Sequence, residues 1–443
     1  MPDNQSRITV IGGGLAGAEA AWQLARRGIP VALYEMRPAR TTGAHRTALL
    51  AEIVCSNSLK SDRPGTAQGL LKEELRTLGS LILSCAEQTR VPAGEALAVD
   101  REAFASLVTE RIEGEPLILL LREEVPSLPE EGTVIAATGP LTSGALADDL
   151  IRITGEKNLA FYDAISPVVE ADSLDHSKLY RASRYQRGES EDYLNVPLSR
   201  EEYEAFVKEL LAAQKVPYAE FEDIREFPAC QPIEEIADKG FDALRFGPFR
   251  PVGLEDPKTG ERPYAVVQLR AENKEGTLYN LVGCQTKMVY EEQKRIFGML
   301  PGFAAAEYVR LGSVHRNAFV NAPRVLAEDL SLKARPDVYI AGQLTGVEGY
   351  LEAVAMGLVV AENVIRKREG RPPLVLPPTT AIGSLQQYLR EATPETFQPM
   401  NFSFGLLSAL PGKPPRHLRR ERYCARARQD LAEALESARR NAV

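Results

Sequence analysis

The feature that most constrains the fold of this chain is a glycine-rich turn near the start of its sequence. A short apolar run at residues 8–11 leads into Gly12-Gly13-Gly14-Leu15-Ala16-Gly17, which has the spacing G-x-G-x-x-G. A helical pattern follows, and a second apolar run at residues 31–34 ends on Glu35. Glycine at these positions permits a tight turn and close packing of a helix against a strand. The segment therefore predicts a βαβ unit within a parallel, Rossmann-like sheet.

The same unit predicts a bound dinucleotide. Gly14 lets the backbone approach a pyrophosphate, and the following helix offers unpaired N–H groups and a partial positive charge. We expect Glu35 to accept hydrogen bonds from the adenosine ribose and to disfavour a 2′-phosphate. A structural βαβ unit without a ligand is the alternative. The residues expected at the dinucleotide are Gly12, Gly13, Gly14, Leu15, Ala16, Gly17 and Glu35.

Two later segments favour FAD as that dinucleotide. Residues 131–140 form an apolar strand that ends in Ala-Thr-Gly, with Gly139 in the turn. Residues 337–343 form another strand, which passes through Gly342 and is followed by Glu348, Tyr350 and a helical pattern. A second glycine-lined turn before a helix suits a further phosphate or flavin contact. The arrangement resembles the glutathione-reductase type of FAD-binding domain, whose last strand and helix return late in the chain.

Because these segments lie far apart, we expect an α/β protein with a split Rossmann-like FAD-binding domain and an inserted α+β domain. Residues 1–155 and 300–443 are assigned to the FAD-binding domain, and residues 156–299 to the inserted substrate or tRNA domain. Within the first part, residues 66–90 have the pattern of a single helix with Cys85 on or near its apolar stripe.

Composition and charge exclude several classes of protein. The chain has 443 residues, 44% of them hydrophobic and 26% charged, which is typical of a globular protein with two or three folded units. We find neither an apolar run near the roughly 18 residues of a membrane span nor a secretory signal pattern. Scattered cysteines and histidines argue against a disulfide framework and a metal site. We therefore expect a cytoplasmic protein without membrane or metal partners.

Two of the five cysteines lie in segments that suit thiol chemistry. Cys55 lies among small polar residues close to Lys60, where a thiolate would be stabilised. Cys230 lies between Pro228 and Pro232, in a stiff loop that would fix the geometry of an attack. An inert loop or core thiol is the alternative for each. The acids that follow Cys230 do not favour its ionisation, so a basic partner from elsewhere in the fold would be needed.

Further segments carry a specific resemblance over most of the chain. They are IGGGLAG, VCSNSLKSD, ATGPLTS, FPACQPIEE, FGPFRPVGL, NLVGCQTKM, EEQKRIFGMLPG, VHRNAFVNAP, AGQLTGVEGYLEA, TTAIGSL and MNFSFG. Together they resemble the folate- and FAD-dependent tRNA (uracil-5-)-methyltransferases. The flavoproteins that modify the wobble uridine of tRNA are a related family, which shares the FAD segments and the AGQ…GY…EA stretch.

The resemblance implies a reaction and roles for individual residues. FAD reduced by NADH or NADPH supplies electrons, 5,10-methylenetetrahydrofolate supplies the carbon, and the product is 5-methyluridine at position 54 in the T-loop of tRNA. Cys230 matches the thiol that attacks C6 of uracil, and Cys55 matches a second functional thiol close to the flavin. Tyr350 matches an aromatic residue against flavin and folate. The division of work between the two thiols stays open, because either could act as base or nucleophile.

A tRNA partner requires a local basic surface, because the net charge of the chain is −8. The candidates are Arg416, Arg419, Arg420, Arg422, Arg426 and Arg428 near the end of the sequence, and Arg181, Arg184 and Arg187 beside Tyr180 and Tyr185. Arginine and aromatic planes could stack on unpaired bases, and the target base would have to be extruded from the folded tRNA. A solvated charged face is the alternative for each cluster.

Other functions remain possible at this stage. The wobble-uridine flavoproteins share the FAD segments, an FAD oxidoreductase of a small metabolite would need neither folate nor RNA, and a flavin-bearing RNA-binding module would need no thiol. FPACQPIEE and the basic residues argue against the small-metabolite enzyme.

Overall fold

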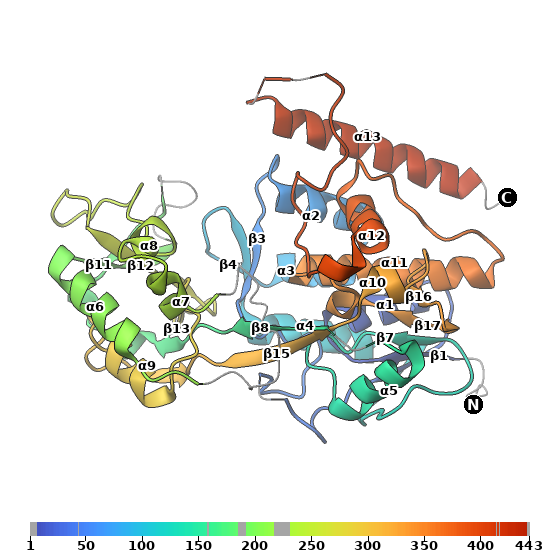
Figure 1. Ribbon diagram of the computed structural model, residues 1–443, viewed down its shortest axis with the longest axis horizontal. Helices are drawn as coiled ribbons and strands as arrows, with labels where there is room; N and C mark the ends of the chain where they lie inside the picture. The colour runs from blue at the N-terminus through green and yellow to red at the C-terminus, as the bar shows by residue number, and fades with distance from the viewer. Residues whose placement is uncertain are drawn as a thin grey trace.

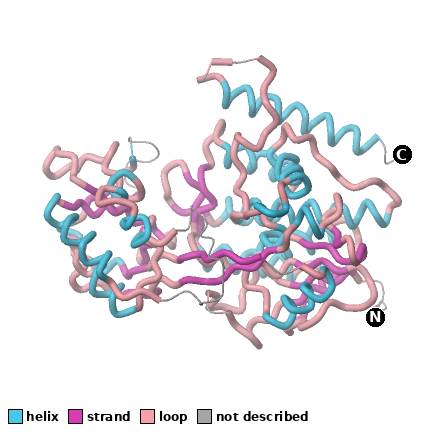
Figure 2. Tube along the Cα trace, in the orientation of Figure 1, coloured by secondary structure: helices cyan, strands magenta, loops and turns pink. Residues whose placement is uncertain are grey.

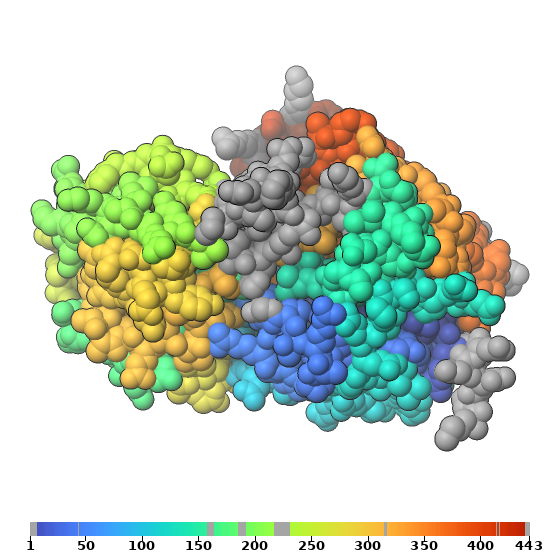
Figure 3. Space-filling model, turned by 60° about the horizontal axis from the view of Figure 1, so that its bottom comes forward, coloured from blue at the N-terminus to red at the C-terminus, as the bar shows by residue number. Residues whose placement is uncertain are grey.

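A computed structural model describes residues 7–42, 44–156, 159–184, 192–216, 231–412, 414–415 and 417–440. The described chain forms two lobes (Figure 1). The larger lobe combines segments from the beginning and the end of the sequence, and the smaller lobe is built from the middle. Figure 3 shows the smaller lobe, in green and yellow, beside the blue, teal and orange segments of the larger one.

The larger lobe is built on a six-stranded sheet with the order β16-β17-β7-β1-β2-β6. Its strands are β1 (Ile8–Ile11), β2 (Val31–Tyr34), β6 (Ile118–Leu121), β7 (Val134–Ala136), β16 (Ser331–Leu332) and β17 (Arg335–Ile340). All pairings are parallel except that of the edge strand β16 with β17. β17 pairs with β7 although the whole smaller lobe separates them in sequence, which confirms the predicted α/β fold with a split Rossmann-like sheet.

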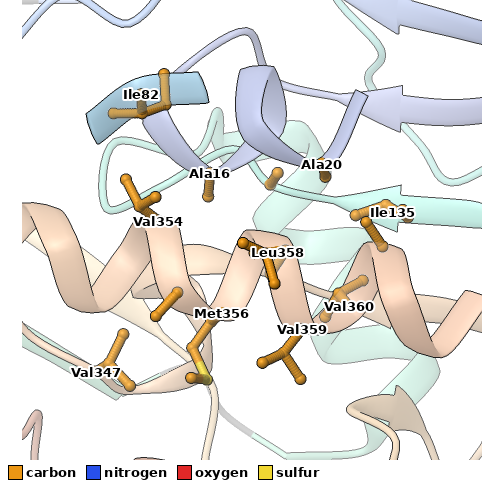
Figure 4. Close-up of a cluster of buried hydrophobic side chains, with 14 of the residues drawn as sticks. Ala16, Ala20, Ile82, Ile135, Val347, Val354, Met356, Leu358, Val359 and Val360 are labelled. Carbon is orange, nitrogen blue, oxygen red and sulfur yellow. The ribbon is translucent and has the colours of Figure 1, made fainter. Parts of the chain in front are cut away.

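Helices α1 (Leu15–Ala25) and α11 (Tyr350–Arg368) pack closely against each other beside this sheet. A Cβ atom on Gly357 of α11 would lie 2.4 Å from the carbonyl oxygen of Ala16, so glycine is required at this crossing. Figure 4 shows Ala16 and Ala20 of α1 on the side that faces Val354 and Leu358. The N-termini of both helices follow the carboxyl ends of strands, where ligands of Rossmann-like folds bind.

The rest of the larger lobe includes a three-stranded sheet and several helices. The sheet has the order β3-β5-β4, from β3 (Ser58–Ser61), β4 (Arg90–Val91) and β5 (Ala96–Val99). The helices are α2 (Ala67–Leu78), α3 (Leu81–Gln88), α4 (Arg101–Glu113), α5 (Gly144–Thr154), α10 (Ala322–Val325), α12 (Ala381–Glu391) and α13 (Arg419–Arg440), with the 3-10 turns η6 (Gly342–Thr345) and η7 (Pro394–Thr396).

The prediction of one helix over residues 66–90 is wrong. Gly79 adopts a left-handed conformation with φ +75° and ends α2. The Ser80 side chain then accepts a hydrogen bond from the backbone N–H of Leu83 and caps α3. A glycine at the end of one helix and a serine at the start of the next are common termination and capping signals, and here they prevail over a continuous apolar stripe.

The smaller lobe contains an antiparallel six-stranded sheet with the order β10-β11-β12-β13-β9-β14. The strands are β9 (Val168–Glu170), β10 (Tyr180–Arg181), β11 (Tyr193–Leu198), β12 (Ala265–Ala271), β13 (Leu278–Leu281) and β14 (Tyr308–Arg310). The helices are α6 (Arg200–Ala212), α7 (Ile233–Asp238), α8 (Ala243–Phe246) and α9 (Tyr290–Phe297), with the 3-10 turns η2 (Ala171–Ser173) and η3 (His176–Lys178). Its buried residues form a core of their own, separate from that of the larger lobe.

Two long strands connect the lobes. β8 (Leu159–Ala164) and β15 (Val314–Phe319) pair in antiparallel fashion and run between them (Figure 2). The core of the smaller lobe begins at Val169 and ends at Phe303. This supports an inserted domain close to residues 156–299, although those boundaries stay a prediction. In the described part of the chain, we find no helix with the length and apolar character that a membrane crossing requires.

Candidate functional site

The glycine-rich turn has a different reason for glycine at each position. Gly12 has φ +103°, and a Cβ on it would lie 2.6 Å from the carbonyl oxygen of Ala137. A Cβ on Gly17 would lie 1.8 Å from the carbonyl oxygen of Gly12, so Gly17 allows α1 to start against β1. Gly14 meets nothing within 4 Å and faces open space. Gly12 and Gly17 therefore serve the turn itself, whereas Gly14 leaves room for a ligand.

A pocket that opens to solvent lies along this turn. Gly12 and Gly14 line one side of it, and Glu35 and Thr138 line others. Gly139 has φ +66° and, like Gly14, meets nothing within 4 Å of its Cβ position. No side chain caps the N-terminus of α1 at Gly14, so the backbone N–H groups there are available to a ligand. These features fit the nucleotide part of FAD.

Glu35 lies at the end of β2, as expected, but its carboxylate already has partners. It accepts hydrogen bonds from the backbone N–H of Gly13 at 3.0 Å and from that of Arg37 at 3.0 Å. The Arg37 guanidinium donates two more, at 2.9 and 3.2 Å. Burial opposes ionisation of Glu35, but Arg37 outweighs it and lowers the pKa of the carboxyl. The expected bond from Glu35 to a ribose therefore stays a prediction and competes with Arg37, which the sequence pattern did not indicate.

A second, larger cavity lies at the N-terminus of α11. It also opens to solvent, and it borders Leu141, which lines the first pocket too. Cys55, Glu348 and Tyr350 line it together, although 295 residues separate Cys55 from Tyr350 in the sequence. Gly342 packs closely against Ala16 of α1, since a Cβ on Gly342 would lie 2.5 Å from the Cβ of Ala16. The glycine-rich turn and the thiol therefore lie at two neighbouring pockets that share Leu141.

Cys55 and Tyr350 are in direct contact. The phenol oxygen of Tyr350 lies 2.7 Å from the sulfur of Cys55. The same oxygen accepts hydrogen bonds from the backbone N–H of Cys55 at 3.0 Å and that of Ser56 at 3.2 Å. Burial, reinforced by the neighbouring Cys55, raises the pKa of Tyr350 well above its usual value. Burial therefore favours the neutral form of the tyrosine.

Three arginines hold the segment that carries Cys55. Arg101 donates to the carbonyl oxygen of Ile53 at 2.5 Å. Arg310 donates to the carbonyl oxygen of Val54 at 2.7 Å. Arg270 donates to the hydroxyl of Ser56 and to the amide oxygen of Asn57, each at 2.7 Å. Arg101 begins α4 of the larger lobe, whereas Arg270 and Arg310 belong to β12 and β14 of the smaller one. The segment is thus fixed from both lobes.

These arginines place positive charge around the segment. Arg101 also forms an ion pair with Glu272, which offsets part of its charge. The bonds that Arg270 and Arg310 make to the segment go to uncharged oxygens, so these bonds do not offset their charge. Burial lowers the pKa of Arg310 to about 10, which still leaves it charged at neutral pH. Sequence reasoning singled out Lys60 as the cation near Cys55 and missed these arginines, because all three lie far from residue 55 in sequence.

The other cysteines differ in their surroundings. Cys230 lies outside the described residues, so its predicted role stays untested. Cys85 is buried, as expected for a core thiol, and burial raises its pKa to about 11. Cys284 and Cys424 are also buried, and burial raises the pKa of both. Among the described cysteines, Cys55 alone lines one of the two cavities.

The candidate tRNA-binding residues separate into two groups. The first group makes contacts within the fold. Tyr180 is buried, Arg181 donates to the hydroxyl of Tyr279, and Arg428 pairs with Glu73. Arg184 donates to the carbonyl oxygens of Arg250 and Val252, and Arg426 donates to those of Ser408 and Ala409. Arg419, Arg420 and Arg422 are exposed on the first turn of α13. Arg187, Tyr185 and Arg416 lie outside the described residues. The expectation that Tyr180 stacks on bases is not supported, because its ring is only 3% exposed.

Comparison with known proteins identifies the family to which this chain belongs. A family model described as "Glucose inhibited division protein A" matches residues 7–372. A methylenetetrahydrofolate--tRNA-(uracil-5-)-methyltransferase TrmFO of Geobacter sulfurreducens is 57% identical over 96% of this chain and 98% of its own length. The protein of the same name from Desulforudis audaxviator is 54% identical over 96% of each chain.

Solved structures show the same fold. The structure of Aquifex aeolicus GidA in its form I crystal has a TM-score of 0.68, with 17% identity, over 97% of this chain and 76% of that one. The described residues contain no group of three or more histidine, cysteine, aspartate or glutamate side chains that could hold a metal ion. This chain belongs to the TrmFO family of methylenetetrahydrofolate--tRNA-(uracil-5-)-methyltransferases, within the wider glucose inhibited division protein A family.

Proposed function

We propose that this protein methylates C5 of a uridine in tRNA, with methylenetetrahydrofolate as carbon donor and FAD as cofactor. The relatives that match it over nearly their whole length carry this activity in their names. The structural observation that carries the proposal is the pair of neighbouring pockets, one along the glycine-rich turn and the other at Cys55 and Tyr350, with Leu141 lining both. A dinucleotide long enough to occupy both would bring its reactive end to the thiol.

The residues present fit FAD. The turn at Gly12 to Gly17 and the open space at Gly14 and Gly139 would accommodate the pyrophosphate. Gly342 and Glu348, with Tyr350 at the start of α11, would border the flavin end. When bound, FAD supplies the two electrons that turn a methylene group into a methyl group. The protein itself binds and orients the reactants and holds a thiol beside them.

Finer parts of the proposal rest on the resemblance. Cys230 would attack C6 of the uracil, which makes C5 nucleophilic, and Cys55 would act at the same ring. The target would be the T-loop uridine at position 54, and NADH or NADPH would reduce the flavin. The exposed arginines 419, 420 and 422 would bind the tRNA backbone. The protein would work in the cytoplasm, without membrane or metal partners.

Labelled methylenetetrahydrofolate tests the proposal. The flavoprotein is incubated with NADH or NADPH and tRNA that lacks the modification, and the label is then located by nuclease mapping. We expect label in the T-loop, none after substitution Cys230→Ala, and normal transfer by Cys85→Ala, a matched change of a core thiol. Label at the wobble position would instead favour the related flavoproteins, and transfer from S-adenosylmethionine would contradict the proposal.

A further inference from the structure

The hydrogen bonds at Tyr350 favour one direction for its proton. Two of its three close neighbours are the backbone N–H groups of Cys55 and Ser56, at 3.0 and 3.2 Å, and an N–H group can only donate. Both therefore direct their protons at the phenol oxygen. The hydroxyl proton is then available to the third neighbour, the sulfur of Cys55 at 2.7 Å. A thiolate would accept this bond more strongly than a neutral thiol, because charge strengthens an acceptor.

The charges around the pair favour the same assignment. From α4, Arg101 interacts electrostatically with both Cys55 and Tyr350. From the smaller lobe, Arg270 and Arg310 hold the flanking residues, and Glu272 offsets part of their charge. On the cavity side, Lys60, Glu348 and the buried Glu352 line the same pocket as Cys55, and Lys60 pairs with Glu352 at 3.8 Å. Arg310 keeps two buried guanidinium nitrogens without a hydrogen-bond partner in the described chain, so its charge is little neutralised.

We propose that Tyr350 is a positioning residue that holds Cys55 as a thiolate through the bond from its hydroxyl, within the positive field of Arg101, Arg270 and Arg310. The role of this thiolate in methyl transfer rests on the proposed function, but its ionisation does not. An ionised sulfur beside the second cavity is ready to act as a base or a nucleophile without first losing a proton. The arrangement thus adds three arginines to Lys60, the basic residue that the sequence around Cys55 shows.

The opposite assignment would place the charge on Tyr350, with Cys55 as the donor. Two backbone donors could also stabilise a phenolate, so the two assignments have the same geometry and differ only in the position of the proton. They differ in ultraviolet absorption, because thiolate and tyrosinate absorb at different wavelengths. Ultraviolet absorption therefore shows which of the two groups carries the proton.

The test is a pH titration of the ultraviolet difference between the purified flavoprotein and its Cys55→Ser variant. We expect a thiolate signal whose midpoint lies below the value of about 8.5 for an ordinary cysteine. Substitution Tyr350→Phe should raise that midpoint by roughly one to two pH units, the size expected for loss of a charge-assisted hydrogen bond. An unchanged midpoint in Tyr350→Phe, or a tyrosinate signal in place of the thiolate signal, would overturn the inference.

Two charge variants separate the electrostatic effect from a loss of structure. Arg101→Gln should raise the midpoint, whereas Glu272→Gln should lower it, and general loosening of the segment would not produce opposite shifts. Tyr388→Phe is the matched control, because the Tyr388 hydroxyl donates to the carbonyl oxygen of Gln398 away from the cavity. The tRNA methylation assay is run separately. If methylation fails while the titration behaves as expected, the proposed function falls and this inference stands.

Discussion

The side chains of Asn57 and Arg270 join the two lobes through a buried hydrogen bond of 2.7 Å from the guanidinium Nε to the amide oxygen. Asn57 is fully buried, and its amide nitrogen also donates to the carbonyl oxygen of Ala271 at 2.8 Å and that of Val99 at 3.0 Å. Asn57 therefore links β5 of the larger lobe to β12 of the smaller one, two residues after the thiol.

Substitution Asn57→Ala should destabilise the protein strongly. It leaves a buried guanidinium nitrogen and two buried carbonyl oxygens without partners, at a cost of about 3 kcal/mol. Denaturant unfolding measures this loss. Asn273→Ala is the matched control, because the Asn273 side chain bonds only within an exposed turn, to Thr277. A loss at Asn57 no larger than at Asn273 would show that the lobes do not depend on this link.

Gly14→Ala should reduce FAD binding without loss of stability. The alanine methyl group would enter open space, and Gly14 has an ordinary negative φ, so the fold accommodates it. The same methyl group would obstruct a pyrophosphate that approaches the backbone. Flavin content and the free energy of unfolding are measured together. Gly144→Ala, also next to open space at the start of α5, should change neither. Full flavin content in Gly14→Ala would contradict the assigned position of the pyrophosphate.

The fold was largely predictable from local patterns, whereas the site was not. The strands at β1, β2, β7 and β17 each follow from an apolar run that ends at glycine or an acid, so sequence alone indicated a split parallel sheet. The surroundings of Cys55 depend on residues 101, 270, 310 and 350, which meet only after both lobes have folded. The pairing of Glu35 with Arg37 was also missed, because sequence spacing does not show whether a carboxylate already accepts hydrogen bonds from the protein itself.

Glu74 should make stability decrease as pH rises. It is buried and accepts bonds from the backbone N–H groups of Ala381 and Ile382, and burial raises its pKa to about 7. Between the unfolded value of about 4.3 and about 7, the folded state binds the extra proton, so the free energy of unfolding falls with increasing pH. The fall amounts to at most about 4 kcal/mol.

Substitution Glu74→Gln should remove this part of the pH dependence, which unfolding at a series of pH values would measure. Glu73→Gln is the matched control, because Glu73 is the neighbouring residue, more exposed and paired with Arg428. An equal slope in Glu74→Gln and in the unchanged protein would contradict a raised pKa at Glu74.

The exposed arginines on α13 should contribute to tRNA affinity through charge alone. The double substitution Arg420→Gln and Arg422→Gln should weaken tRNA binding and reduce the slope of log affinity against log salt concentration by roughly 1 to 2. Flavin content should not change. Arg200→Gln, an exposed change on α6 in the smaller lobe, tests whether any lost arginine has this effect. An unaltered salt dependence in the double variant would exclude this surface as the tRNA contact.

The most direct test of the account is a single turnover without oxygen. The enzyme, with its flavin fully reduced and no nicotinamide cofactor present, is mixed with methylenetetrahydrofolate and unmodified tRNA, and flavin oxidation and 5-methyluridine are both quantified. We predict one methyl group formed for each flavin oxidised, with tetrahydrofolate as the other product. Methyl groups formed without flavin oxidation, or dihydrofolate in place of tetrahydrofolate, would contradict the account.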